Sequence, residues 1–252
     1  MARFLPAFLP ARTLGQAGDN GAGIALGVSA GGAVAHMDSA SSWRFINPPK
    51  AWPKGVIVNR QGKRYCNESS YGSVIGTTMY RDHAGRGFLI LDQTLFEQST
   101  DYLKRDARAM ISMVVKAQLK RAVSAESISA LANAIGVDPE GLEVTVRDYN
   151  LAAKDEREDD QAKALTDMAV ISKPPFYAID IAGDGCPSLS LGGLVVDEAN
   201  GRVKTESGEL IAGLYAAGRT AVGIASNNYV SGLSIADGVF SGRRAGRAAA
   251  AD

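Results

Sequence analysis

Short apolar runs bounded by turn residues recur along this chain and predict β-strands. Runs of this length are typical of strands rather than helices. The expected strands lie at 88–92, 174–181 and 214–217. Two further segments are expected to fold back as hairpins, one over 55–68 around a Gln61-Gly62 turn and one over 191–204 around residues 198–201.

Apolar residues at helical spacing lie between these strands and predict a helical region from about 95 to 154. Residues 124–127 offer N-cap candidates for a helix that ends at Gly136, and Asp138 with Pro139 starts the next helix. Two further helices, rich in small residues, are expected over 24–30 and from about 231–234 onward. The pattern therefore indicates an α/β fold.

Composition and charge exclude several classes of function. The 252 residues, 46% of them hydrophobic, suffice for one large or two small domains with a substantial core. Basic and acidic residues number 27 each, so the formal net charge is zero and neither nucleic acid nor an anionic membrane surface is an expected partner. The charged run at 154–160 is expected to be a solvated surface turn.

The cysteines and histidines indicate neither a disulfide framework nor a metal site. Cys66 and Cys186 form no C-x-x-C motif, and His36 and His83 do not have ligand spacing. No apolar run reaches the ~20 residues of a membrane span. Prolines interrupt the apolar stretch at the N-terminus, which argues against a signal peptide. The sequence predicts a soluble, cytoplasmic protein without a metal.

The segment from 213 to the C-terminus carries the most informative pattern. A strand ends at Gly218, a loop rich in Gly, Ser and Asn follows, and a helix then begins. A helix N-terminus presents backbone N–H groups and a partial positive charge, which favour an anion or an electron-rich ring edge. The stretches 213–219, 226–237 and 242–248 resemble the C-terminal flavin-binding segment of the fumarate reductase and 3-ketosteroid dehydrogenase flavoproteins.

Other segments carry the same resemblance. Residues 58–68 are similar to the family's V-N-x-x-G-x-R-(F/Y)-x-N-E pattern at the start of its substrate-covering domain, and 131–150 resemble its cap helices. The resemblance implies FAD as cofactor and a discontinuous, partial Rossmann-like FAD-binding domain with an inserted α+β substrate-capping domain. It implies these domain bounds: 1–45 and 176–252 for the FAD-binding part, and 46–175 for the cap.

The substrate end of the family pattern departs from the fumarate reductases. The arginine that clamps a substrate carboxylate in those relatives falls at Tyr229, and their histidine pair falls at Ser188 and Leu189. This argues against a fumarate-type substrate. The Tyr229-Val-Ser231-Gly232 arrangement instead resembles 3-ketosteroid dehydrogenases, nearest the Δ4-(5α) type and related to the Δ1 type.

That resemblance implies roles for individual residues. The Tyr229 O–H and the Gly232 backbone N–H would polarise a ketone oxygen, while Ser231 and Tyr71 would accept or relay the α-proton as a hydride leaves to flavin N5. The active site is expected between the two domains, with Tyr71 facing Tyr229 and Ser231. Glu68 is expected to be structural. The implied flavin contacts are Leu189, Ser190, Gly218, Arg219, Leu233, Ser234 and Ile235.

One part of a dinucleotide site is missing from the sequence. Such a site normally consists of a strand, a G-x-G-x-x-G turn and a helix, followed about 20 positions later by an acidic residue. The sequence contains no such unit. The resemblance covers the second half of such a flavoprotein, so an N-terminal nucleotide-binding half is an expected partner. The other expected partners are an apolar, steroid-like ketone as substrate and an external electron acceptor.

Two alternatives to a steroid dehydrogenase stay open. A fumarate-reductase-like enzyme acting on an unsaturated acid would need a basic group near the flavin, for which Arg219 and Arg64 are candidates. A truncated, non-catalytic fragment would bind FAD only together with the upstream half.

Overall fold

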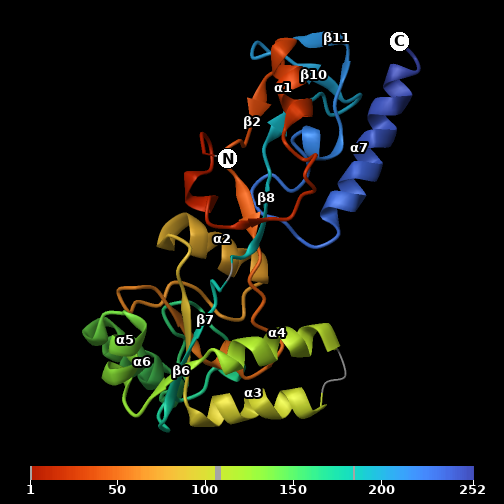
Figure 1. Cartoon of the computed structure of the whole chain (residues 1–252). Coiled ribbons are helices and arrows are strands. Elements are labelled where there is room, and N and C mark those ends of the chain that lie inside the picture. Colours follow the sequence, from red (N-terminus) through yellow and green to blue (C-terminus); the bar gives the residue numbers. More distant parts are fainter. Residues whose placement is uncertain (1, 106–108, 184) are drawn as a thin grey trace. The chain divides into compact units, whose positions relative to one another are not determined.

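The computed structural model describes residues 2–105, 109–183 and 185–252 and divides into two compact units (Figure 1). Unit 1 combines Met1–Ser42 with Pro187–Asp252, and unit 2 is Trp43–Cys186. Unit 1 is therefore discontinuous in sequence, and unit 2 is inserted within it.

Unit 2 contains a four-stranded antiparallel sheet. Its order is β4 (Val56–Val58), β5 (Phe88–Leu91), β7 (Phe176–Asp180) and β6 (Val123–Ala125). The central residues of β4 and β5 are completely buried, as their continuous apolar runs predict. Residues 123–125 lie within the region expected to be helical, but they form a strand. They do so because β7 has a free edge with which they can pair.

The position of β7 also changes the expected domain boundary. Residues 176–180 were assigned by resemblance to the FAD-binding part, but β7 is hydrogen-bonded between β5 and β6 and belongs to unit 2. The chain returns to unit 1 only at Pro187. The first boundary lies after Ser42, a few residues before the expected one.

Unit 2 also contains the helices α2 (Gly72–His83), α3 (Gln93–Arg105), α4 (Ala109–Lys120), α5 (Ile128–Ile135) and α6 (Pro139–Lys154), with 3₁₀ turns at Trp52–Lys54 and Leu165–Asp167. Helices α3, α4 and α5 contact strands of the sheet, and α6 packs on α5. Ser127 caps α5 by accepting a hydrogen bond from the Ala130 N–H at 3.2 Å, and Asp138 caps α6 in the same way. Helices α3 and α4 lie side by side (Figure 1). The sequence pattern did not predict α2, whose polar and small residues hide its buried face.

Unit 1 is built from short strands. Strand β8 (Pro187–Ser190) lies between β1 (Arg12–Thr13), which is parallel, and β3 (Ala40–Ser42), which is antiparallel. Two further pairs are β2 (Val34–Ala35) with β9 (Gly193–Leu194), and β10 (Arg202–Lys204) with β11 (Leu210–Tyr215). The helices are α1 (Ala22–Ser29) and α7 (Leu233–Ala249), with 3₁₀ turns η1 (Pro6–Phe8) and η4 (Gly218–Thr220).

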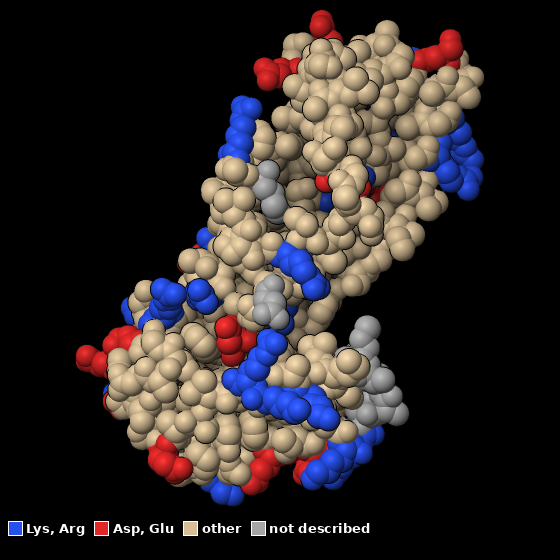
Figure 2. All heavy atoms as spheres, in the orientation of Figure 1, with Lys and Arg blue, Asp and Glu red and all other residues tan. Residues whose placement is uncertain are grey.

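The core of unit 1 is small, and much apolar surface remains exposed. Leu194, Val203, Ala216 and Ala221 form its buried cluster. Along α7, by contrast, Ile235, Val239 and Phe240 are more than half exposed. Uncharged residues make up most of the visible face in Figure 2, with acidic and basic side chains scattered along it. Among the described residues, no helix combines the length and apolar character that crossing a membrane requires.

Two adjacent glycines allow backbone segments of unit 1 to approach closely. A Cβ atom on Gly192 would lie 2.5 Å from the His36 carbonyl oxygen. A Cβ atom on Gly193 would lie 2.6 Å from the Ala221 carbonyl carbon. Because both contacts are with backbone, neither can be relieved by a side-chain rotation.

We therefore predict that Gly193→Ala destabilises the protein by about 1–3 kcal/mol, as overpacking of a tight interior does. Urea denaturation of both proteins would measure the change. The control is Gly246→Ala within α7, where an added Cβ meets nothing within 4 Å and should stabilise by about 0.5–1 kcal/mol. Equal stability of the Gly193 variant and the wild type would contradict the close approach.

Candidate functional site

A loop in unit 1, residues 221–232, carries the three expected catalytic groups Tyr229, Ser231 and Gly232. It runs from η4 to α7, and Gly232 takes the N-cap position of α7 with φ +95°, a conformation that favours glycine. Ser231 lies one position earlier, and no side chain caps the helix by a hydrogen bond.

The phenol of Tyr229 lies at the start of α7. Its oxygen accepts a hydrogen bond from the Ser234 N–H at 3.3 Å. The pKa of Tyr229 is below its usual value of 10 because Ser234 hydrogen-bonds to the phenol oxygen, with smaller contributions from the Gly232 backbone and the Arg219 charge. An acidified phenol is a stronger hydrogen-bond donor to an oxygen that gains negative charge.

The backbone of Tyr229 is held by its neighbour Asn228. The Asn228 Oδ1 accepts hydrogen bonds from the Tyr229 N–H at 2.8 Å and from the Ser41 hydroxyl at 3.2 Å. Ser41 is on β3, directly opposite Leu189 of β8. The structure thus connects the Tyr229 loop to the strand pair that carries the expected flavin contacts Leu189 and Ser190. The sequence analysis did not single out Asn228.

The other expected flavin contacts lie at both ends of this loop. Gly218 and Arg219 form η4, and the Gly218 N–H donates to the Ser241 hydroxyl of α7 at 2.9 Å. Leu233, Ser234 and Ile235 form the first turn of α7.

The N–H groups of this first turn were expected to face a flavin edge, but in the structure they donate to the protein itself. Leu233 donates to the Val230 carbonyl, Ser234 to the Tyr229 phenol and Ile235 to the Gly232 carbonyl. The tight Gly232 turn explains this, because it brings the preceding loop back over the helix end. A ligand edge that used the Ser234 N–H would have to replace the Tyr229 phenol.

A surface cavity of about 560 Å³ lies beside this region of unit 1. Its lining includes Gly218, Gly223, Asp237, Ser241 and Arg244. The Arg244 Nε is buried and has no hydrogen-bond partner in the described part of the chain, while its Nη1 donates to the Glu198 carbonyl at 2.9 Å. An unused guanidinium donor in a cavity fits an anionic group such as a phosphate.

Tyr71, the fourth expected catalytic residue, belongs to unit 2. It occupies the N-cap position of α2 and is 38% exposed, with its ring packed edge-to-face on Phe45 at 5.4 Å between centroids. Tyr71, Glu68 and Ser69 line a cavity of about 180 Å³. Tyr71 is therefore accessible to a small molecule.

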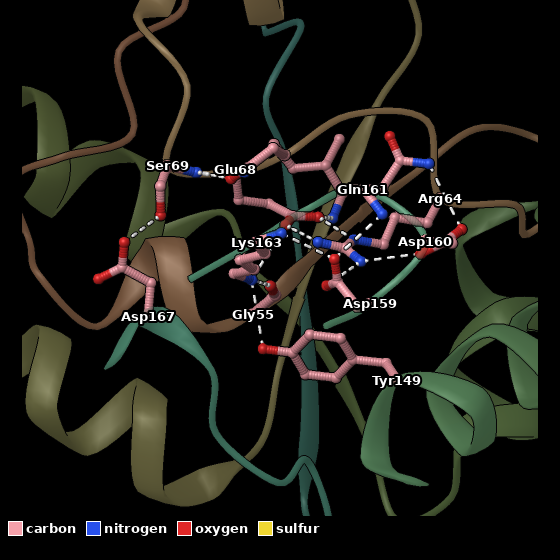
Figure 3. A network of polar contacts seen from close by, with 12 residues as sticks. Gly55, Arg64, Glu68, Ser69, Tyr149, Asp159, Asp160, Gln161, Lys163 and Asp167 are labelled. Carbon is pink, nitrogen blue, oxygen red and sulfur yellow. Dashed lines mark hydrogen bonds and ion pairs between the residues drawn. The ribbon is translucent and has the colours of Figure 1, made fainter. Parts of the chain in front are cut away.

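A buried ionic network lies just before Tyr71 (Figure 3). The Glu68 side chain is fully buried and accepts hydrogen bonds from the Ile57 N–H at 2.8 Å and from Arg64 through both Nε and Nη2. The Lys163 Nζ lies 3.0 Å from the Glu68 Oε2, and the Lys163 side chain is also fully buried. Glu68 thus has a structural role, as the sequence suggested.

The network corrects one expectation. The run 154–160 was expected to be a solvated turn, but the Asp159 side chain is 2% exposed and its Oδ2 lies 2.5 Å from Arg64 Nη1. Asp159 also accepts hydrogen bonds from the backbone N–H groups of Gln161 and Lys163. The missed signal is this local turn, in which an Asp bonds to the N–H groups two and four residues later.

The loop between Glu68 and Tyr71 is attached to the same region. The Asn67 amide donates to the Ala162 carbonyl at 3.0 Å. The Ser69 hydroxyl donates to Asp167 at 2.7 Å (Figure 3). The network therefore fixes the path of the chain that leads to Tyr71.

His36 lines the cavity beside the Tyr229 loop, whereas the His83 ring lies against Tyr65 in unit 2. Cys66 and Cys186 are buried, and neither forms a disulfide. Within the ranges that the structure describes, no group of three His, Cys, Asp or Glu residues could hold a metal ion.

We predict that Glu68→Gln lowers the free energy of unfolding by about 3–5 kcal/mol, since it leaves the buried Arg64 and Lys163 charges incompletely paired. The matched control is Asp160→Asn, which also removes an Arg64 partner but is 72% exposed, so a loss under about 1 kcal/mol is expected. Denaturant unfolding of both variants measures the difference. Similar losses for the two would show that burial does not strengthen the network.

The same network predicts a pH dependence. Burial opposes ionisation of Asp159, but hydrogen bonds from Lys163 N–H and Arg64 lower its pKa below the usual 3.8. A lowered carboxyl pKa stabilises the folded state above the unfolded pKa, and this stability is lost as the pH falls through the folded pKa. The difference in unfolding free energy between wild type and Asp159→Asn should therefore shrink below about pH 4. If the difference in unfolding free energy between the two proteins stayed constant as the pH fell, the lowered pKa of Asp159 would be contradicted.

Comparison with known proteins agrees with this geometry. The FAD binding domain family matches residues 1–235. The 3-oxo-5-alpha-steroid 4-dehydrogenase of Comamonas testosteroni is 37% identical over 224 residues, which cover 86% of this chain and 42% of that protein. The NADH:acrylate oxidoreductase of Vibrio harveyi is 31% identical over 211 residues, which cover 81% of this chain and 19% of the relative.

A solved structure gives the same result. The crystal structure of 3-ketosteroid-delta4-(5alpha)-dehydrogenase from Rhodococcus jostii RHA1 in complex with 4-androstene-3,17-dione superposes with a TM-score of 0.80 at 29% identity, covering 99% of this chain and 49% of that one. The chain spans less than half the length of each of these relatives. The α/β flavoprotein fold expected from the sequence is confirmed, and this chain belongs to the FAD binding domain family, whose cofactor is FAD.

Proposed function

We propose that this chain forms the flavin-contacting and substrate-contacting part of an FAD-dependent oxidoreductase that dehydrogenates a 3-ketosteroid next to its carbonyl group. Unit 1 is the FAD-binding part and unit 2 the substrate-capping part. The observation that carries the proposal is the Tyr229 phenol, with its lowered pKa, at the start of α7. The relatives named as steroid dehydrogenases support it.

The residues of unit 1 fit FAD. The flavin contacts proposed from the sequence lie on β8, on η4 and on the first turn of α7, and Asn228 bonds to Ser41 of β3, the strand paired with β8. Arg244 offers a buried donor in the adjacent cavity, which suits a phosphate oxygen. Arg219 supplies a second positive charge for the same purpose. FAD, when bound, supplies the acceptor for the substrate hydride.

The protein groups would bind the ketone and move one proton. The Tyr229 O–H donates a hydrogen bond to the ketone oxygen, and the Gly232 N–H assists, so that negative charge developing on that oxygen is stabilised. Tyr71 and Ser231 take the proton from the carbon next to the carbonyl. A carboxylate substrate would need a guanidinium where Tyr229 stands, which favours an uncharged ketone.

Three further partners or conditions belong to this proposal. The adenosine part of FAD would be held by a dinucleotide-binding segment, because the sequence contains no strand, G-x-G-x-x-G and helix unit. An external acceptor would reoxidise the flavin. Cys66 and Cys186 are not joined in a disulfide, which fits a reducing, cytoplasmic environment.

One observation favours reduction of an unsaturated acid as a second candidate. Arg219 is close enough to Tyr229 to lower its pKa, so a basic group is present near the catalytic phenol. The relative named NADH:acrylate oxidoreductase also supports this candidate. Full activity of Tyr229→Phe on an enoic acid, with loss in Arg219→Gln, would favour it over the steroid reaction.

The first test is the visible spectrum of the chain after incubation with FAD and desalting. If flavin is retained, a saturated 3-ketosteroid added without oxygen should bleach it. We predict that Tyr229→Phe slows this bleaching by about 10²–10³-fold, as loss of one oxyanion donor does, while FAD retention is unchanged. If the protein is colourless, the same assay needs the dinucleotide-binding segment supplied as a second chain.

The matched control is Tyr177→Phe, which removes a phenol that bonds to Gln93 within unit 2. It should leave the bleaching rate unchanged. A Tyr229→Phe protein that bleaches at the wild-type rate would refute the proposed role. A flavin-loaded protein that no 3-ketosteroid bleaches would refute the proposed reaction. Absence of flavin even with the second chain would favour a non-catalytic fragment.

A further inference from the structure

The loop that carries Tyr229 has contacts to the rest of unit 1 at both ends. At its start, the Val222 N–H donates to the Leu194 carbonyl at 2.9 Å. At its end, the Leu233 N–H donates back to the Val230 carbonyl at 3.1 Å as α7 begins. Between these ends the loop is rich in small and polar residues, and Val230 and Ile224 are exposed rather than packed in a core. Apolar packing therefore does little to hold this stretch.

The Asn228 side chain provides a polar attachment in the middle of the loop. Its Oδ1 is the acceptor for two donors, the Tyr229 N–H at 2.8 Å and the Ser41 hydroxyl at 3.2 Å. A backbone N–H can only donate, so the amide oxygen and not the amide nitrogen must face Tyr229. An amide oxygen has two lone pairs and can satisfy both donors at once.

The far side of this attachment is rigid. Ser41 is completely buried at the centre of β3, where it is paired with Leu189 of β8. Asn228 itself is exposed, so a substitution there does not open a cavity in the core. The bond from Ser41 to Asn228 fixes the backbone next to Tyr229. The Ser234 N–H fixes the phenol at the far end of the Tyr229 side chain.

We propose that Asn228, through its bond to the buried Ser41 hydroxyl, is a positioning residue that holds the Tyr229 phenol over the start of α7. The catalytic part of this role rests on the proposed function, because Tyr229 is the proposed donor to the ketone. The positioning part does not, since it can be measured on the phenol itself.

The charges around the phenol define the readout. Arg219 of η4 acts on Tyr229 and also on Asp237 of α7, and the Ser234 hydrogen bonds keep the phenol pKa below 10. If the loop detaches from β3, the hydrogen bonds from Ser234 and the attraction of Arg219 should weaken together. The pKa of Tyr229 should then rise toward the value of about 10 of a free tyrosine.

The experiment is a near-ultraviolet tyrosinate titration of the chain, with the Tyr229→Phe titration subtracted to isolate one phenol. We expect Asn228→Ala to raise the pKa of Tyr229, and Ser41→Ala to raise it similarly. The double variant should add little to either, because both remove the same bond. Asn227→Ala is the matched control, an exposed asparagine next to the site, and should leave the pKa unchanged.

The outcomes separate this inference from the proposed function, because the titration needs neither FAD nor substrate. An unchanged Tyr229 pKa in Asn228→Ala, or additive shifts in the double variant, would overturn the positioning role. If Ser41→Ala does not fold, Asn228→Ala alone against Asn227→Ala still decides it. In the flavin-loaded enzyme, Asn228→Ala should lower kcat about 10- to 100-fold with FAD retention unchanged, as a displaced catalytic group does.

Discussion

The pairing of β3 with β8 is the constraint on which unit 1 depends. Ala40, Ser41 and Ser42 pair with Ser190, Leu189 and Ser188, and all of unit 2 lies between these strands in sequence. Closing so long a loop costs entropy if the intervening chain is unfolded. Unit 2 removes much of this cost by bringing its own ends together.

Arg44 shows how the ends of unit 2 are joined. Its Nε donates to the Cys186 sulfur at 3.3 Å, and its Nη2 donates to the Ala182 carbonyl at 3.1 Å. The Tyr80 oxygen accepts from the Cys186 N–H at 2.9 Å, which ties the same segment to α2. The strands that leave unit 2 therefore start side by side, and β3 and β8 need only continue their pairing, which the Ser42 and Ser188 hydroxyls extend with a hydrogen bond.

The proposed function rests on polar groups that are held by other polar groups. In unit 1 the Tyr229 loop has little core to pack against, so hydrogen bonds from Ser41 and Ser234 hold it. In unit 2 the segment before Tyr71 is held by the buried Glu68, Arg64 and Lys163 charges. Replacing a fully paired buried ion pair by apolar groups is often neutral for stability, whereas removing one partner alone is strongly destabilising. Of the two proposed catalytic tyrosines, Tyr229 therefore directly follows its polar anchor Asn228, and Tyr71 lies three positions after Glu68.

The sequence by itself determined the α/β class, the flavin-binding resemblance, the caps at Ser127 and Asp138, and the residues of the Tyr229 loop. These follow from local patterns, in which a residue's neighbours in sequence are its neighbours in space. Tertiary structure decided that 123–125 is a strand, that β7 belongs to unit 2, that Asp159 is a buried partner of Arg64, and that Lys163 is a buried partner of Glu68. Each of these depends on a contact with a distant segment. The sequence pattern of a short charged stretch is that of an exposed surface turn. Whether one of its charges is buried depends on a partner of opposite charge, and that partner can come from a distant part of the chain.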